Sequence, residues 1–267
     1  MGIKWNNAPI FYTVAQIRFN PVLSLKSYVD QIQERFRKSG YPDFRKREGF
    51  RLSLDQLVGK APTNLPPRFE PTEQYSFDNQ QRNAGFVLDQ SMLSFQTTSY
   101  ETSDYFLSQV ISGLTTVNEL VQLDFFERVG VRYLDAVTPE REEQISQYVV
   151  PEVLGIAGLV EGANIEHSFS ETVIQLANNC RVTSRTVIQN GRIQFPPDLH
   201  VLELKLPARV VDHENIYALI DTDAVYELRE DFDVTALRAH LERLRDGARR
   251  AFKATYTDYA ETKWSRA

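Results

Sequence analysis

The 267-residue chain has an ordinary globular composition, with 42% hydrophobic, 25% charged and 11% aromatic residues, which excludes a disordered protein and supplies enough apolar side chains for a core. Its formal net charge of −6 argues against nucleic acid as the main partner, because phosphate contacts need clustered Lys and Arg. No apolar run is long enough for a signal peptide or a membrane span, so we expect a cytoplasmic protein.

The first part of the chain mixes strand and helix patterns. A strand at 11–19 ends at Asn20-Pro21, and apolar residues at helical spacing predict a helix from about 23 to 39. Gly40 and Pro42 end this helix, and the prolines of 61–71 indicate an exposed loop. The remaining patterns predict strands at 44–55, 69–77, 84–89, 92–99 and 126–137, and a helix at 104–122.

The second part begins after an acidic segment that contains several Gly and Pro residues. Asn190-Gly191 predicts a hairpin turn, because both residues tolerate positive φ, and Trp264 is expected to dock the C-terminal tail. A short helix is expected at 141–149 and a long one at 234–254. The strand patterns lie at 165–176, 180–188, 192–195, 199–206 and 215–225.

These elements predict an α+β protein made of two mainly antiparallel sheet units, each with long amphipathic helices packed on one face. We place the N-terminal unit at 1–137, a connecting segment at 138–164 and the C-terminal unit at 165–267. Strand, Asp-led turn and long helix follow in the same order at 92–122 and 215–254. This order suggests a duplicated sheet-plus-helix unit.

The strand at 126–137 supplies the first candidate binding surface. Val129, Val131 and Tyr133 alternate with Arg128, Gly130 and Arg132, so the two sets lie on opposite faces. The arginines are about 13 Å apart along the strand and could straddle an anion or a cluster of partner carboxylates, while the glycine would admit another backbone. Alternatively, both arginines pair with Asp or Glu on neighbouring strands.

Two basic stretches offer a nucleic-acid or nucleotide surface instead. The first contains Arg45, Lys46, Arg47 and Arg51, and the second runs along the last helix. Binding to phosphates through either stretch would weaken steeply with salt. The basic residues of the last helix are Arg243, Arg245, Arg249, Arg250 and Lys253.

Asp198, Glu203 and Lys205 have the residue types of a nuclease-like metal motif, in which two carboxylates bind a divalent ion and a lysine helps to activate water. The five-residue step from Asp198 to Glu203 is shorter than such sites use, and a plain strand with Leu202, Leu204 and Leu206 buried explains the same pattern. Asp221 and Asp223 lie on one face of a strand and could share a metal or a proton. They could equally cap the turn that follows.

No other motif indicates catalysis. The single cysteine, Cys180, excludes a disulfide within the chain and a cysteine-based zinc site, and no base can be assigned to it. The histidines lack a metal-ligand spacing, and His240 is expected at the edge of the core beside a leucine stripe. We therefore favour a protein that is not an enzyme and uses no cofactor and no metal.

Three segments resemble a sporadically distributed bacterial family of about 250 to 280 residues with no settled activity. They are API-FYTVAQIRFNP with the helix that ends at Tyr41-Pro42, the element RVGVRYLDAV, and the last helix with its aromatic tail near Trp264. Asp135 stands where the family leads us to expect Asn. The resemblance implies an accessory protein of mobile elements or phage-defence neighbourhoods.

The sequence thus predicts a non-enzymatic binding, sensor or scaffold subunit of a bacterial anti-phage defence system. We expect it to act through a protein partner from a neighbouring gene, and antiparallel sheet edges would also allow a homodimer. The alternatives are a metal-dependent nuclease-like hydrolase and a nucleic-acid or nucleotide binder. Nucleic acid is the less favoured partner.

Overall fold

The structure is a computed structural model. It describes residues 5, 7–53, 68–160, 162, 165–177, 179–199 and 202–265, without the side chains of 49–53 and 68–72. The proline-rich loop expected at 61–71 lies mostly outside the described residues, as does His200.

All strands that the structure describes belong to one ten-stranded antiparallel sheet, with helices packed against it. The prediction of two sheet units is therefore wrong. The strands follow the order β2-β3-β4-β5-β1-β6-β9-β8-β7, and β10 pairs with the first residues of β6. Their bounds are β1 Ile10–Phe19, β2 Asp43–Ser53, β3 Arg68–Asp78, β4 Ala84–Asp89, β5 Met92–Thr97, β6 Phe125–Val137, β7 His167–Gln175, β8 Cys180–Asn190, β9 Ile216–Tyr226 and β10 Glu230–Asp231.

The pairing of β1 with β6 joins the strands β2–β5 on one side of the sheet to β7–β9 on the other. Ile17 lies opposite Val129 and Ala15 opposite Val131, so buried apolar residues of both strands share one face. Each strand also pairs on its other side, β1 with β5 and β6 with β9. Alternation along a strand predicts its buried face but not its neighbour, which is why the sequence did not reveal a continuous sheet.

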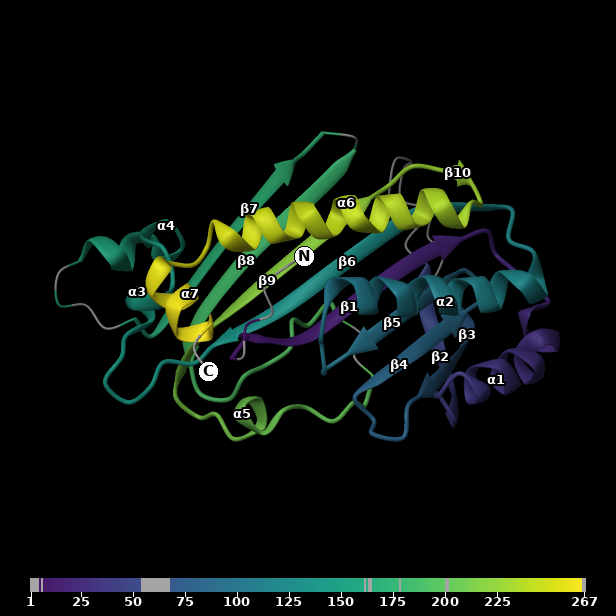
Figure 1. The fold of residues 1–267 in the computed structure, drawn as a ribbon, viewed down its shortest axis with the longest axis horizontal. Helices are drawn as coiled ribbons and strands as arrows, with labels where there is room; N and C mark the ends of the chain where they lie inside the picture. Colours follow the sequence, from purple (N-terminus) through teal and green to yellow (C-terminus); the bar gives the residue numbers. More distant parts are fainter. Residues whose placement is uncertain are drawn as a thin grey trace.

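Three helices cover one face of the sheet: α1 (Val29–Lys38), α2 (Ser103–Val121) and α6 (Val234–Lys253) (Figure 1). The 3-10 turn η1 (Leu25–Tyr28) precedes α1. Thr102 and Asp233 cap α2 and α6 by accepting hydrogen bonds from backbone N–H groups of the first turn. The main core lies between these helices and the sheet, and it includes Phe36, Phe86, Leu114 and Leu241. Within the described residues, the helices and strands expected before residue 137 are confirmed.

A smaller cluster of helices closes the end of the sheet where β7 begins. It contains α3 (Ile145–Tyr148), α4 (Pro151–Leu154), the 3-10 turn η2 (Gly155–Leu159) and α7 (Asp258–Ser265). Trp264 is buried there among Tyr148, Tyr256 and Ile220, which confirms the expected docking of the tail. The helix expected at 141–149 is shorter than predicted.

The chain between β8 and β9 differs from the prediction. Asn190, the last residue of β8, pairs with Ile216 of β9. The predicted hairpin turn at Asn190-Gly191 is therefore wrong, because no strand follows it directly. The described residues of the expected strands at 192–195 and 199–206 have no strand structure. Pro196, Pro197 and Pro207 explain this, because proline cannot donate to a ladder. We call 192–207 the strap; the short helix α5 (Ala208–Val211) follows it.

The two halves of the sheet repeat one connectivity. In the first half, β1 is followed by helix and by the strands β2–β5, the last of which returns to pair with β1 before α2 begins. In the second, β6 is followed by short helices and by β7–β9, the last of which returns to pair with β6 before α6. The segments 92–122 and 215–254 thus occupy corresponding places. Among the described residues, the second half has no counterpart of β2, the edge strand that pairs with β3 in the first half.

Candidate functional site

The sheet face opposite the three helices, which we call the open face, is partly covered by the strap. The strap is held there through its backbone: Leu202 N–H donates to Gln96 Oε1 at 2.8 Å, and Lys205 N–H donates to the carbonyl of Arg82 at 2.6 Å. Leu202 and Leu204 pack on Val87. The strap therefore forms one wall over the open face.

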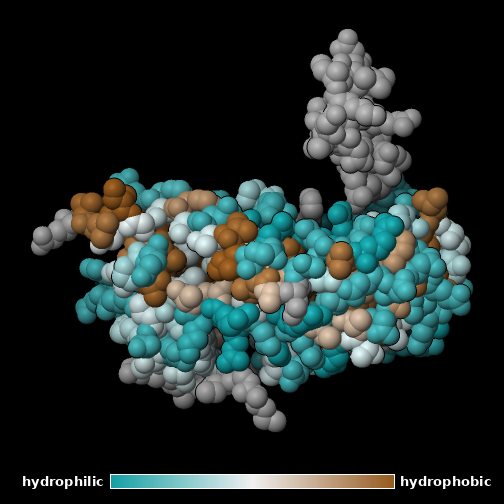
Figure 2. All heavy atoms as spheres, turned by 90° about the horizontal axis from the view of Figure 1, so that it is seen from above, coloured by the Kyte–Doolittle hydropathy of each residue, from teal (hydrophilic) through white to brown (hydrophobic). Residues whose placement is uncertain are grey.

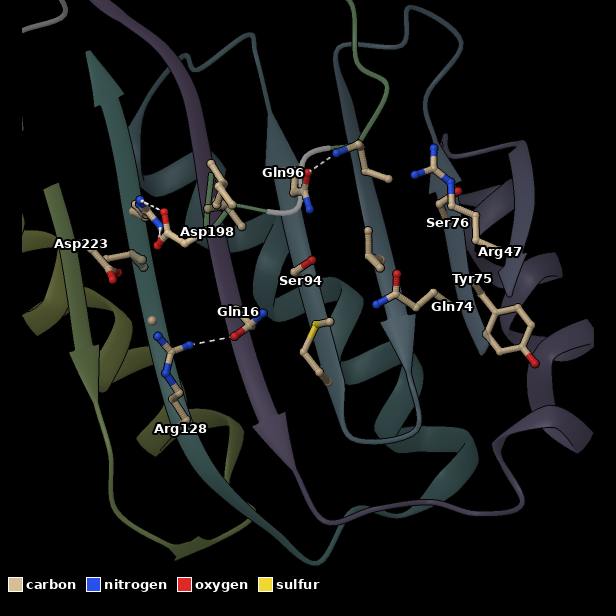
Figure 3. Close-up of a pocket in the computed structure, with 18 residues that line it drawn as sticks. Gln16, Arg47, Gln74, Tyr75, Ser76, Ser94, Gln96, Arg128, Asp198 and Asp223 are labelled. Carbon is tan, nitrogen blue, oxygen red and sulfur yellow. Dashed lines mark hydrogen bonds and ion pairs between the residues drawn. The ribbon is translucent and has the colours of Figure 1, made fainter. Parts of the chain in front are cut away.

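Beside the strap, the open face is hollowed. This hollow has a volume of about 430 Å³, within the range of small-molecule sites. Figure 3 shows side chains from β9, β6, β1, β5, β4, β3 and β2 around it. The polar lining residues are Gln16, Arg47, Gln74, Ser76, Ser94, Gln96, Arg128, Arg132, Asp198 and Asp223, and the others include Val14, Val87, Met92, Gly130, Leu199 and Leu202.

Arg132 is the anchor of this site. Its Nε and Nη2 donate to the two oxygens of Asp221, each at 2.7 Å, and its Nη1 and Nη2 donate to Asp198 at 2.9 and 3.1 Å. Arg185 Nη1 also approaches Asp221 Oδ2 at 3.3 Å. Burial lowers the pKa of the Arg132 guanidinium, but the hydrogen bonds to Asp221 and Asp198 have the larger combined effect. The pKa is therefore raised. Arg132 thus ties the strap to β6 and β9, as the ion-pair alternative anticipated.

Arg128 and Gly130 leave room for a ligand. Arg128 Nη1 donates to Gln16 Oε1 at 2.7 Å, and its Nε lies 3.4 Å from a carboxylate oxygen of Glu227. A Cβ added at Gly130 would meet no atom closer than 3.4 Å, the nearest being Nη1 of Arg128. The glycine therefore keeps part of the hollow free between strands.

Asp223 is the unusual carboxylate of the hollow. It lies opposite Arg132 in the β6–β9 register, yet it makes no hydrogen bond or ion pair with any residue that the structure describes. Burial raises its pKa, although the charges of Arg132 and Arg128 act in the opposite direction. Asp223 is thus an acceptor that a ligand in the hollow could satisfy.

The basic stretch on β2 is neutralised by carboxylates. Arg45 pairs with buried Asp78 and, at 2.9 Å, with Glu203, which also lies 2.9 Å from Arg47. Lys46 contacts Glu48 and Glu73, each at 2.9 Å, from the opposite face of the strand. The side chain of Arg51 lies outside the described part. These ion pairs leave few free cations for phosphates.

The nuclease-like residues do not converge. Glu203 binds Arg45 and Arg47, Asp221 is buried beneath Arg132, and the backbone of Lys205 is fixed to Arg82. Leu202 and Leu204 are buried as expected, but in the strap rather than in a strand. Within the described ranges, no group of three or more His, Cys, Asp or Glu residues could hold a metal.

The other singled-out residues are structural. Cys180 is buried, and burial raises the pKa of its thiol. His240 is also buried, with its Nε2 3.1 Å from a carboxylate oxygen of Glu230, which confirms its place at the edge of the core.

A second hollow, of about 610 Å³, lies between the β7–β8 turn and the C-terminal half of α6. Arg249, Arg250 and Lys253 line it and have no ion pair with any described carboxylate. Leu176, Ala177, Cys180, Arg243 and Asp246 complete the lining.

Sequence reasoning placed Arg128, Gly130, Arg132, Arg47, Asp198 and Asp223 in separate hypotheses, and all six line the first hollow. It missed the uncharged groups Gln16, Gln74, Ser76 and Ser94. The sequence did contain a signal for them, because each is next to a buried apolar residue of the core face along its strand. Neighbouring residues of a strand point to opposite faces, so these polar side chains belong to the open face. Only the order of the strands brings them together.

Comparison of the chain with protein-family models, with curated proteins and with solved structures gave no match. The family resemblance therefore remains a prediction. Among the helices that the structure describes, none is long and apolar enough to cross a membrane.

Proposed function

We propose that this chain is a non-catalytic binding protein whose hollow on the open face receives a small polar ligand. The observation that carries the proposal is Asp223, a carboxylate that lines the hollow without a hydrogen bond or ion pair to a described residue. Its side chain is partly exposed in the hollow, so its oxygens can accept hydrogen bonds from a ligand that enters there.

The chemistry of the lining defines the ligand class. Asp223 would accept hydrogen bonds from an amine, amidine or amide N–H group, and Arg128 would donate to a carbonyl or an anionic oxygen. Gln16, Gln74 and Ser94 offer neutral groups that can donate or accept. An amphoteric small molecule, with a donor edge and an acceptor edge, fits this arrangement.

Binding without turnover is favoured because the remaining carboxylates are already engaged. Asp198 and Asp221 hold Arg132, and Glu203 holds Arg45 and Arg47. A general base or a metal ligand would have to give up these ion pairs before it could act.

The test is a thermal-shift screen of amino acids, nucleosides, nucleotides and sugars, followed by calorimetric titration of each compound that binds. Gly130→Val places a side chain in the free part of the hollow, and valine suits a strand. We expect this variant to stay folded and to lose binding. Arg37→Ala, at an exposed ion pair with Glu34 on α1 and thus on the other face of the sheet, is the control and should bind normally.

Two further variants separate the roles of the charged groups. Arg128→Ala should weaken binding about ten- to a hundredfold, the loss of one charge-assisted hydrogen bond. Asp223→Asn should weaken the binding of ligands that carry a cationic donor more than the binding of neutral ligands. A compound that binds equally well to wild type and Gly130→Val would contradict the proposed site, and metal-dependent cleavage of nucleic acid would contradict the proposed function.

The role as sensor or scaffold of an anti-phage defence system, with a partner from a neighbouring gene, rests on the family resemblance. It is tested by purifying the tagged chain from its own host under phage challenge. A stoichiometric partner that is lost with Gly130→Val would connect the hollow to that role. A partner retained by this variant would assign the contact to another surface.

One observation favours nucleic acid as a second candidate ligand, at the second of the two basic stretches. Arg249, Arg250 and Lys253 of α6, which have no ion pair among the described residues, line the second hollow, whereas Arg45, Lys46 and Arg47 of β2 are neutralised. Anisotropy of a labelled single-stranded oligonucleotide should show affinity that falls steeply with salt, and each Ala substitution should lower the salt slope by roughly one. A flat salt response would exclude this candidate.

A further inference from the structure

The outer edge of β7 is the least protected part of the sheet. β7 spans His167–Gln175 and pairs with β8 in an unbroken register on one side, and no described strand pairs with it on the other. It contains no Pro, no Lys and no bulge, which are the usual protections of an edge strand. Phe169 and Val173 are each 57% exposed.

The internal repeat shows what this edge lacks. β3 in the first half and β7 in the second are equivalent, since each lies two strands outward from the strand that pairs with β1 or β6. β3 is flanked by a further strand, β2. In the second half the corresponding position holds no strand of the described chain, and a strand from outside could occupy it.

The sequence of β7 is self-complementary in an antiparallel pairing centred on Glu171. In that register Phe169 lies opposite Val173 of the second copy, and Val173 opposite its Phe169, on the open face. Ser168 lies opposite Ile174, and Ser170 opposite Thr172, on the helix-covered face. Apolar cross-strand pairs of this kind stabilise a sheet. We propose that two copies of this chain dimerise by pairing their β7 strands about a twofold axis at Glu171.

The charges agree with this pairing. Two Glu171 side chains would face each other at the axis, and like charges directly opposite are unfavourable. Each Glu171, however, accepts a hydrogen bond from Arg185 Nε of its own chain at 2.6 Å. This ion pair offsets the charge of the carboxylate and so reduces the repulsion between the two Glu171 side chains at the axis.

The neighbouring surface extends the apolar contact. η2 contacts β7, and its Ile156 and Leu159, with adjacent Val160, are exposed. Figure 2 shows hydrophobic side chains gathered at the end of the molecule where Figure 1 places α4. An exposed apolar patch of this kind is typical of a protein–protein contact.

The first test is the solution mass by light scattering, expected at twice the chain's 30.7 kDa. Val173→Lys should reduce the mass to that of one chain, with an unchanged far-UV spectrum because the side chain is exposed. Leu23→Lys, at an exposed leucine far from β7 in the chain and the sheet, is the control and should remain dimeric. A monomeric wild-type chain would overturn the proposal.

The register is tested by cross-linking. Directly opposite residues have Cα atoms about 4.5 to 5.5 Å apart, within disulfide range, so Glu171→Cys should form a covalent dimer on mild oxidation. Val173→Cys should not, because its counterpart would lie about 13 Å along the strand. The native Cys180 is buried and leaves the background low. A dimer that cross-links equally through both positions, or through neither, would overturn the β7 pairing.

Discussion

Arg132 and Asp221 form a bidentate ion pair across β6 and β9, with two N–O distances of 2.7 Å and side chains that are only 8% and 2% exposed. The remaining guanidinium contacts hold Asp198 of the strap. One arginine therefore joins two strands and the wall of the hollow. The same residue that the sequence offered as a binding group is first of all a structural one.

Arg132→Leu should lower the free energy of unfolding by about 3 to 5 kcal/mol, because it leaves Asp221 buried with Arg185 as its remaining cation. Urea denaturation measures the loss. Arg192→Ala should cost less than about 1 kcal/mol, since its pair with Glu214 is exposed. Equal effects of the two substitutions would contradict the structural role of Arg132.

Asp135→Asn should make stability less dependent on pH. Burial raises the pKa of Asp135 to about 8, despite the charge of Arg209. Between the unfolded pKa of about 3.9 and the folded value, the folded state binds more protons, so rising pH destabilises the wild type by up to about 1.4 kcal/mol per unit.

The variant, which carries the residue that the family resemblance led us to expect, lacks this dependence. Its free energy of unfolding relative to wild type should therefore rise from pH 5 to pH 8 and level off above. Urea denaturation across this range checks the prediction. A difference that stays constant with pH would mean that Asp135 is ionised in the folded protein.

Gly113→Ala should destabilise the protein, although alanine favours helix by about 1 kcal/mol. A Cβ at Gly113 would lie 2.3 Å from Cε1 of Phe86, where α2 crosses β4. We expect a net loss of about 1 to 2 kcal/mol, since overpacking costs more than the helix gains. Thermal unfolding measures it, and a raised melting temperature would contradict the close contact.

Leu241→Asp should unfold the whole described fold rather than its C-terminal half. Leu241 is fully buried in the main core, and α6 contacts α2 as well as β6, β8 and β9. Leu241→Ala should cost about 2 to 5 kcal/mol and shift a single transition that circular dichroism and tryptophan fluorescence report together. Two separate transitions would show that the halves unfold independently.

The predictions from sequence succeeded where one local signal decided the outcome. Period-two alternation identified β6, and the helical spacing of apolar residues identified α2 and α6. They failed at the strap, where Leu202 and Leu204 alternate like a strand. There the prolines prevent a ladder, and the leucines are buried against Val87 instead.

The candidate site was predictable residue by residue but not as a site. Arg128, Gly130 and Arg132 share a face because they alternate along one strand, and that followed from the sequence. Their meeting with Gln16, Asp198 and Asp223 did not follow, since these residues come from β1, the strap and β9.

The sequence by itself determined most element types, the buried face of most strands and the polar character of the opposite face, because backbone periodicity fixes those locally. Only the tertiary structure decided that β1 pairs with β6 in one sheet, that carboxylates neutralise the β2 cations and that Asp223 stays without a hydrogen-bonding partner among the described residues. Pairing and charge balance depend on which distant segments become neighbours, and that is decided by the packing of the whole chain.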